Sequence, residues 1–309
     1  MKFFKTFFLF TPFFAAAQIN SSVVNKCQET NYQFFRQGQQ EQQSSKKYDA
    51  QGNLLKQIDT FSSQNTGNYT NEYAYEYDTD GKNSQVTYKQ NGQVKKVTKK
   101  NYNAAGNLVS ETTSADGKTT PLALLTANNG ETLQVFYAKD GVTELTKEKN
   151  TFNKVGQLLK KEISTASGNL MMSDTKSYNL QGNIAQSIHF DAADKITLLT
   201  DYEYDAKGNL LKDKTIRNNI LYAETNNEYD LVGKLSKKIR LNGKGQIDYY
   251  FTYEYDSQGN MSKENYFYNN QMISVRTFEY DANRNKIKES YLDRTGNVSM
   301  YKIWEFACK

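Results

Sequence analysis

The chain has 309 residues and a formal net charge of +5 at pH 7, and 37% of its residues are hydrophobic. Its mean hydropathy is −0.81, and much of the apolar content is aromatic, with 23 Tyr and 17 Phe. Basic and acidic residues are interleaved, which is typical of a solvated surface, so we expect no nucleic-acid partner. The shortage of Val, Ile and Leu excludes a sheet covered on both faces and favours one with at least one wet face.

The first 17 residues predict a secretory signal peptide. A basic start is followed by a short apolar stretch and by the small-residue end Ala15-Ala16-Ala17. This stretch is too short to span a membrane, and no later stretch is long and apolar enough, so we expect no membrane insertion. The sequence therefore predicts an exported protein, periplasmic or extracellular, with an N-terminal lead at 18–31 and a single domain at 32–309.

One short motif recurs along the chain, as Y-D-A-K-G-N-L at 204–210 and Y-D-S-Q-G-N-M at 255–261. Most successive copies are separated by 25 or 26 residues, a period typical of stacked supersecondary units. The glycines of the copies are Gly52, Gly81, Gly106, Gly156, Gly182, Gly208, Gly233 and Gly259, with Arg284 in the ninth place. A degenerate copy with Gly130 fills the double-length gap between Gly106 and Gly156.

The motif predicts a hairpin turn. Its Asp side chain can accept hydrogen bonds from the turn backbone, and Gly three residues later suits the left-handed position that closes a bulged hairpin. This register places Tyr204 opposite Leu210 across the hairpin. A weaker set of turns midway between the main ones makes each unit two strands and two turns. The fold class is thus all-β, a continuous antiparallel β-meander of about 22 strands, which we expect to form a twisted open sheet or a spiral shell.

Two segments depart from this pattern. Residues 118–130 are expected to be irregular, because the degenerate copy lacks the Tyr-Asp lead and follows Pro121. In the ninth turn, Arg284 replaces Gly, and a left-handed backbone costs a non-Gly residue about 1 kcal/mol. We therefore expect this turn to be distorted, with Asn283 or Asn285 taking the positive φ.

The recurrent Y-D-x-x-G-N-L motif resembles the YD repeat of the Rhs family over nearly all of the chain from residue 32 to about residue 300. The resemblance implies a continuous antiparallel sheet that spirals, and in large relatives this sheet forms a hollow shell around a toxic C-terminal segment. The chain ends shortly after the turn at Gly296, so we expect no toxin domain and do not carry over the cargo function. The resemblance therefore implies that this chain is a short, exported YD-repeat protein.

The two cysteines, Cys27 and Cys308, lie near opposite ends of the chain. An exported protein can keep a disulfide, but the bond requires Cα atoms within about 7 Å. Closure of the sheet would protect its edges, yet a ring of about 22 strands encloses a space too wide for side chains to fill. We therefore expect an open spiral without this disulfide.

The sequence offers little for catalysis. The single histidine, His189, has no neighbouring Cys or clustered acidic residues for a metal site or a triad. Asp78-Thr79-Asp80-Gly81 resembles the start of a calcium loop but lacks the closing ligand, and a plain turn explains it better. We expect no enzyme, no cofactor and no metal.

Tyrosine is the unusual enrichment. Alternate residues of a strand share a face. In three units a second tyrosine stands two residues before the motif tyrosine, so the two side chains project from the same face. The predicted aromatic face is made by the pairs Tyr75 and Tyr77, Tyr202 and Tyr204, and Tyr253 and Tyr255. These rings either supply packing that aliphatic residues do not, or form a platform for a ligand.

The functional hypothesis is a non-enzymatic exported β-repeat scaffold that binds a carbohydrate or an envelope or secreted protein. The alternative hypothesis is a shell or capping component of a toxin-type, Rhs-like system. Nothing in the sequence decides the oligomeric state.

Overall fold

The computed structural model describes residues 27–62, 67–104, 106, 108–115, 118–128, 130–138 and 143–308. The predicted signal peptide and most of the predicted N-terminal lead lie outside these residues. The first eleven strands are β1 (Cys27–Arg36), β2 (Gln39–Tyr48), β3 (Leu54–Phe61), β4 (Tyr69–Tyr77), β5 (Asn83–Gln90), β6 (Gln93–Tyr102), β7 (Leu108–Ala115), β8 (Lys118–Asn128), β9 (Glu131–Tyr137), β10 (Glu144–Phe152) and β11 (Leu158–Thr165). The others are β12 (Leu170–Tyr178), β13 (Ile184–Asp191), β14 (Ile196–Tyr204), β15 (Leu210–Arg217), β16 (Ile220–Tyr229), β17 (Leu235–Asn242), β18 (Ile247–Tyr255), β19 (Met261–Tyr268), β20 (Gln271–Tyr280), β21 (Lys286–Leu292) and β22 (Val298–Cys308).

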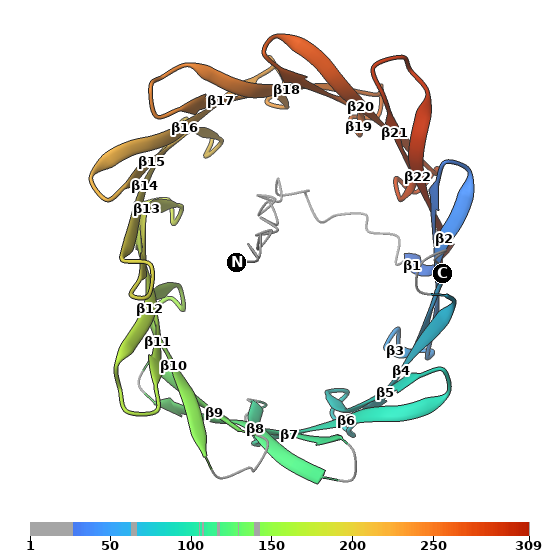
Figure 1. Cartoon of the computed structure of the whole chain (residues 1–309), viewed down its shortest axis with the longest axis vertical. Coiled ribbons are helices and arrows are strands. Elements are labelled where there is room, and N and C mark those ends of the chain that lie inside the picture. The colour runs from blue at the N-terminus through green and yellow to red at the C-terminus, as the bar shows by residue number, and fades with distance from the viewer. Residues whose placement is uncertain are drawn as a thin grey trace, which may run out of the picture.

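Each strand pairs antiparallel with the next one along the chain, so the all-β meander predicted from the repeats is confirmed. The prediction of an open sheet or spiral is wrong, because β1 also pairs with β22, from Cys27 opposite Cys308 to Arg36 opposite Met300. Figure 1 shows the result, a closed ring of strands in which blue β1 meets red β22. The hairpins β1–β2 and β21–β22 flare outward from this ring (Figure 1).

The sheet closes because closure pairs the backbone groups of its two edge strands. An open sheet leaves the backbone N–H and C=O groups of its first and last strands unpaired, and pairing them with each other removes both edges. With strands about 4.8 Å apart and tilted as in other closed sheets, the ring is about 40 Å across. A ring this wide is unfavourable only if its interior must be packed with side chains. Here it need not be, because the strands form a single layer that carries polar side chains on both faces. Water can fill the space that our sequence argument treated as a void.

A disulfide joins Cys27 to Cys308, with Cα atoms 4.0 Å apart, so the prediction that these residues stay unlinked is also wrong. The motif turns all lie at one edge of the ring, and β22 ends and β1 begins at that same edge. The disulfide therefore takes the place that a further motif turn would occupy. No turn can connect β22 to β1, because they are the last and first strands, and the disulfide provides the covalent link instead.

The motif turns have the predicted chemistry. In the turn after β14, Asp205 N–H donates to the Asn209 carbonyl (2.9 Å), and Gly208 N–H donates to the Asp205 carbonyl (3.0 Å). The Asp205 carboxylate accepts the Asn209 N–H (2.8 Å), and Gly208 has a φ of 86°. The hydrogen bond from the Asn209 side chain, assisted by backbone N–H groups, holds the pKa of Asp205 below its ordinary value. Tyr204 lies opposite Leu210, as predicted, with a bulge beside the pair.

A ladder of tyrosine hydroxyls links each unit to the strand before it. The Tyr204 hydroxyl, at the end of β14, donates to the carbonyl of Ile184 at the start of β13 (2.8 Å). The same bond, 2.7–2.9 Å long, is made by Tyr48, Tyr77, Tyr102, Tyr178, Tyr229, Tyr255 and Tyr280. Phe152 holds the equivalent place at the end of β10 and has no hydroxyl. The Tyr of the motif thus has a structural role that its position in the turn alone does not reveal.

Tyr204→Phe is expected to lower the free energy of unfolding by about 1 kcal/mol, the net contribution of one hydrogen bond. Urea unfolding followed by circular dichroism measures the loss. Tyr222→Phe is the control, because the Tyr222 ring is half exposed, and it should change stability by less than about 0.5 kcal/mol. Equal effects of the two substitutions would contradict a stabilising ladder.

Neither predicted irregularity is found in the described residues, and Asn129, within the first of the two segments, lies outside them. Residues Lys118–Asn128 form strand β8, which pairs with β7 and β9. In the ninth turn, Arg284 itself has a φ of 65°, so the prediction that Asn283 or Asn285 takes the positive φ is wrong. Asp281 N–H donates to Asn285 carbonyl (3.0 Å), and Arg284 N–H donates to Asp281 carbonyl (3.0 Å), as in the glycine-containing turns. These bonds and those to the Asp281 carboxylate hold the turn in its ordinary form at the cost of a strained Arg284.

Arg284→Gly is therefore expected to raise the free energy of unfolding by about 1 kcal/mol, because glycine adopts a left-handed backbone without the Cβ clash. The reciprocal change, Gly233→Arg, should lower it by a similar amount. Gly233 has a φ of 85° and open space where a Cβ would lie, so this control isolates the backbone effect. Thermal unfolding of both variants tests the prediction, and opposite shifts in melting temperature are required.

The sheet has two faces, and we call the one that carries Tyr204 and its equivalents the tyrosine face. Among the described residues only Ala223 and Val275 are buried hydrophobic side chains, whereas Ser44, Asp59, Thr225, Asn265, Glu289 and Ser290 are buried polar ones. Stability therefore rests on the backbone ladder, the turns and cross-strand side-chain pairs rather than on an apolar core. No helix with the length and apolarity to cross a membrane occurs in the described part of the chain.

Candidate functional site

The three predicted tyrosine pairs lie on separate strands and do not form one platform. Tyr75 and Tyr77 end β4, Tyr202 and Tyr204 end β14, and Tyr253 and Tyr255 end β18. Ten strand spacings, roughly 48 Å along the sheet, separate β4 from β14. In each pair the second tyrosine is a rung of the hydroxyl ladder, which favours packing as its role.

The pair on β18 continues a run of aromatic residues along this face of its strand, as the pair on β4 does with Tyr69 and Tyr73, whereas the pair on β14 does not. Tyr249, Phe251 and Tyr253 alternate along β18, and Tyr266 of β19 lies opposite Phe251. The ring centroids of Phe251 and Tyr266 are 5.1 Å apart, and those of Tyr249 and Tyr266 are 5.9 Å apart. We call these four residues the aromatic row. Burial raises the pKa of Tyr253 far above its ordinary value, with Glu264 adding to the shift, so its hydroxyl stays neutral.

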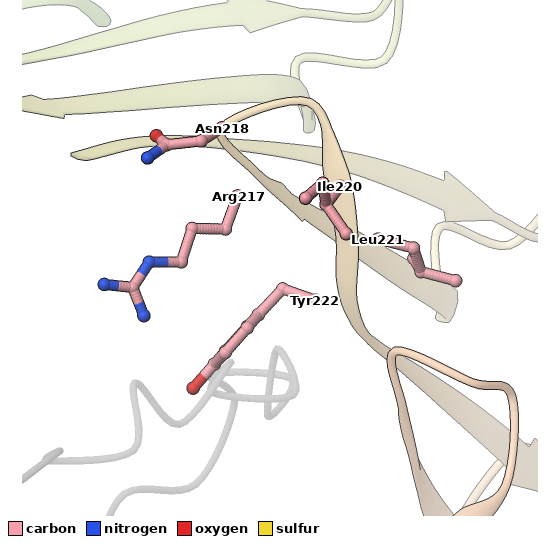
Figure 2. Close-up of a pocket in the computed structure, with 5 residues that line it drawn as sticks. All are labelled: Arg217, Asn218, Ile220, Leu221 and Tyr222. Atoms are coloured by element: carbon pink, nitrogen blue, oxygen red, sulfur yellow. The ribbon is translucent and has the colours of Figure 1, made fainter. Parts of the chain in front are cut away.

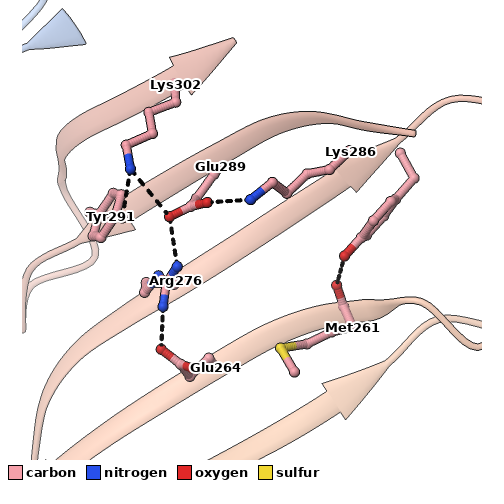
Figure 3. A network of polar contacts seen from close by, with 8 residues as sticks. Met261, Glu264, Arg276, Lys286, Glu289, Tyr291 and Lys302 are labelled. Atoms are coloured by element: carbon pink, nitrogen blue, oxygen red, sulfur yellow. Dashed lines mark hydrogen bonds and ion pairs between the residues drawn. The ribbon is translucent and has the colours of Figure 1, made fainter. Parts of the chain in front are cut away.

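A charged network adjoins the aromatic row (Figure 3). Arg276 of β20 donates to Glu264 of β19 (2.9 Å) and to Glu289 of β21 (2.7 Å). Lys286 donates to the other oxygen of Glu289, Oε2 (2.7 Å), and the Lys302 ammonium of β22 lies 4.0 Å from the oxygen that Arg276 binds. We call these five residues, with Tyr291, the Arg276 network; Glu289 at its centre is only 2% exposed.

The row and the network form one surface. Tyr253, Glu264, Arg276 and Tyr291 lie opposite one another in succession across β18, β19, β20 and β21. The Arg276 guanidinium lies 5.2 Å from the centroid of Tyr291, and the Lys302 ammonium lies 5.4 Å from it. Cation–π contacts of this kind hold both the charges and the rings in place.

The charges of this surface are fixed. Burial alone would raise the pKa of Glu289, but hydrogen bonds from Lys286, Tyr291 and Arg276 overcome it and lower the pKa to about 2. Burial and the bond to Glu289 raise the pKa of Tyr291 to about 12. Near neutral pH, Glu289 is therefore charged and Tyr291 is neutral.

The other candidate sites have fewer interacting side chains. His189 of β13 makes one ion pair, Nδ1 to Asp174 Oδ1 of β12 at 2.7 Å. Asp78 bonds to its own turn backbone, as the plain-turn interpretation predicts. A shallow pocket at the β15–β16 turn is lined by Arg217, Asn218, Ile220, Leu221 and Tyr222 (Figure 2). It contains one cation–π pair and no carboxylate, and the described residues hold no cluster of three metal-ligating side chains.

Sequence reasoning found Tyr253 and Tyr255 but missed the Arg276 network. The β18–β19 turn places Tyr253 opposite Glu264, and the β20–β21 turn places Arg276 opposite Tyr291. Both pairs depend on a bulge beside the turn, which shifts the register by one residue. The register predicted from the motif has no such bulge and sets Tyr253 opposite Lys263, so it does not bring these side chains together.

No protein-family model matches this chain, and no curated protein matches it. Among solved structures, it is similar to the crystal structure of TcdB2-TccC3-Cdc42, with 14% identity and a TM-score of 0.28 over 84% of this chain and 19% of that one. The Photorhabdus luminescens Tc holotoxin pore gives the same values. The chain thus spans about a fifth of these toxin chains.

A porin-like protein from Bacteroides uniformis is similar over 90% of this chain and 98% of its own, with 10% identity and a TM-score of 0.32. All of these similarities occur at very low sequence identity. TM-scores this low carry no functional argument, so function has to be argued from the surface itself.

Proposed function

We propose that this chain is an exported, non-enzymatic β-repeat scaffold whose tyrosine face binds a glycan at the cell envelope. The observation that carries the proposal is the aromatic row, four half-buried rings on two neighbouring strands with charged groups beside them. Aromatic rings present flat apolar faces of the kind that sugar rings stack on, and the polar groups around them can bond sugar hydroxyls. The fixed charges of the Arg276 network favour binding over proton transfer.

The disulfide supports an exported location, since such bonds persist in the periplasm or outside the cell. The closed ring bears on the two other candidate partners. Pairing of β1 with β22 leaves no free strand edge along which a second polypeptide could extend the sheet. A toxin-type shell component would therefore have to stack on the turns, and a protein partner would have to dock on side chains.

The test is a glycan array probed with the mature, disulfide-bonded protein, followed by titration calorimetry on any glycan retained. Tyr266→Ala should weaken binding at least about 10-fold, the loss expected for one well-placed ring. Phe267→Ala is the matched control, because Phe267 is the next residue and stacks on Tyr250 on the opposite face of the same two strands.

Weakening by Tyr266→Ala alone would support a site on the tyrosine face. Equal weakening by both substitutions would contradict it, because the loss would then follow from damage to the sheet. Retention of peptides and no glycans would favour the protein partner instead.

A further inference from the structure

Basic side chains flank the aromatic row on both sides. On β17, Lys238 lies opposite Phe251 and Arg240 lies opposite Tyr249. On the other side are the three basic residues of the Arg276 network. Lys234, just before β17, directs its ammonium over the Tyr255 ring, 4.9 Å from the centroid. Strands β17 to β22 thus carry five basic side chains on the tyrosine face, and Lys234 lies in the turn before them.

Fewer acidic side chains accompany them, and most of these are already bound. Glu264 and Glu289 are engaged by Arg276 and Lys286, and Asp213 lies 3.7 Å from Arg240. Asp248, at the start of β18, is the fourth acidic residue near the row. On the tyrosine face itself, five basic residues stand against Glu264, Glu289 and Asp213, which leaves a positive excess around the rings.

The opposite face of the same strands has no such arrangement. There Lys263 pairs with Glu254 (3.1 Å) and Lys288 pairs with Glu279 (3.0 Å), while Lys237 lies over the Tyr250 ring. A general basic character of the chain would enrich both faces alike. The excess of basic over acidic residues around the aromatic row therefore points to a ligand.

We infer that the ligand of this surface is a polyanionic glycan, a sugar chain bearing carboxylate, sulfate or phosphate groups. The inference rests on the proposed function and adds the class of glycan. Sugar rings stack on the aromatic row while Lys238 on one side and Lys302 on the other bind the anionic groups. From β17 to β22 the surface spans five strand spacings, about 24 Å, which suits an extended chain better than a single sugar.

Biolayer interferometry of the mature, disulfide-bonded protein against immobilised alginate, dextran sulfate, neutral dextran and inorganic polyphosphate tests the inference. We expect binding to alginate or dextran sulfate, little to dextran, and at least about 10-fold weaker binding when salt rises from 50 to 500 mM, because salt screens charge pairs. Lys238→Gln should weaken binding about 5-fold, the effect of one basic residue near an anionic surface.

Lys237→Gln is the matched control, since Lys237 is the preceding residue and lies over Tyr250 on the opposite face. It should leave affinity unchanged. Lys302→Gln is the second variant, on the far side of the row, and should weaken binding as Lys238→Gln does. Equal effects of Lys237→Gln and Lys238→Gln would overturn the inference.

Two further outcomes separate the inference from the proposed function. Salt-insensitive binding to neutral dextran would overturn the inference that the ligand is anionic, but it would support the proposal that this surface binds a glycan. Binding to no carbohydrate would overturn both. Polyphosphate binding that is as tight as alginate binding and unaffected by Phe251→Ala would also overturn the inference, because charge alone would then explain it.

Discussion

Replacing both Cys27 and Cys308 with Ser is expected to lower the free energy of unfolding by about 5 kcal/mol. The disulfide closes nearly the entire described chain, with a sequence separation of 281 residues, and the loss of unfolded-state entropy grows with the length of the closed loop. Without it, the junction of β1 and β22 is held only by hydrogen bonds and side-chain contacts such as Tyr32 with Trp304 and Phe35 with Tyr301.

Urea unfolding of the variant and of the reduced wild type measures this effect, and the two should agree. Hydrogen exchange should locate it, with protection lost first in β1 and β22 and retained in strands on the far side of the ring, such as β12. Unchanged exchange in β1 and β22 after reduction would show that backbone pairing alone closes the ring.

The strands and turns of this fold were predictable, because they depend on local chemistry. Asp205 and Gly208 define a turn within five residues, and the turn sets the register of Tyr204 against Leu210. Closure depends on two strands at opposite ends of the chain, whose paired cysteines are 281 residues apart, and no local pattern reports such a pairing. The cysteines did mark it, but a closed ring follows from them only because the interior of this ring does not have to be packed.

The candidate site was predictable only in part, for a similar reason. The tyrosine pairs repeat with the motif, so Tyr253 and Tyr255 stand out in the sequence. Arg276 and Glu289 belong to no repeated motif. They become part of the candidate site only because the pairing of β18 to β21 places them beside aromatic side chains. Repetition reveals what the units share, whereas a binding surface arises from what one part of the ring has and the others lack.

Glu289→Gln is expected to lower the free energy of unfolding by about 3 kcal/mol at pH 7. Glu289 is the buried acceptor for Arg276 and Lys286, with Lys302 nearby, and its neutral replacement leaves these basic groups with too little negative charge. Glu279→Gln is the control, because Glu279 pairs with Lys288 on the opposite face as a largely exposed ion pair. An exposed pair contributes about 0–1 kcal/mol, so the control should have little effect.

The dependence on pH makes this prediction specific. The pKa of Glu289 is lowered from 4.5 to about 2 in the folded protein, so the folded state holds the proton less tightly than the unfolded state. The stability from this group is therefore fully present above about pH 4.5 and is lost as the pH falls toward 2, by about 3 kcal/mol in total. Glu289→Gln removes this titration, so the difference between wild type and variant should shrink steadily when urea unfolding is repeated from pH 5 down to pH 2. A difference that stays constant over that range would show that Glu289 contributes through its shape and not through its charge.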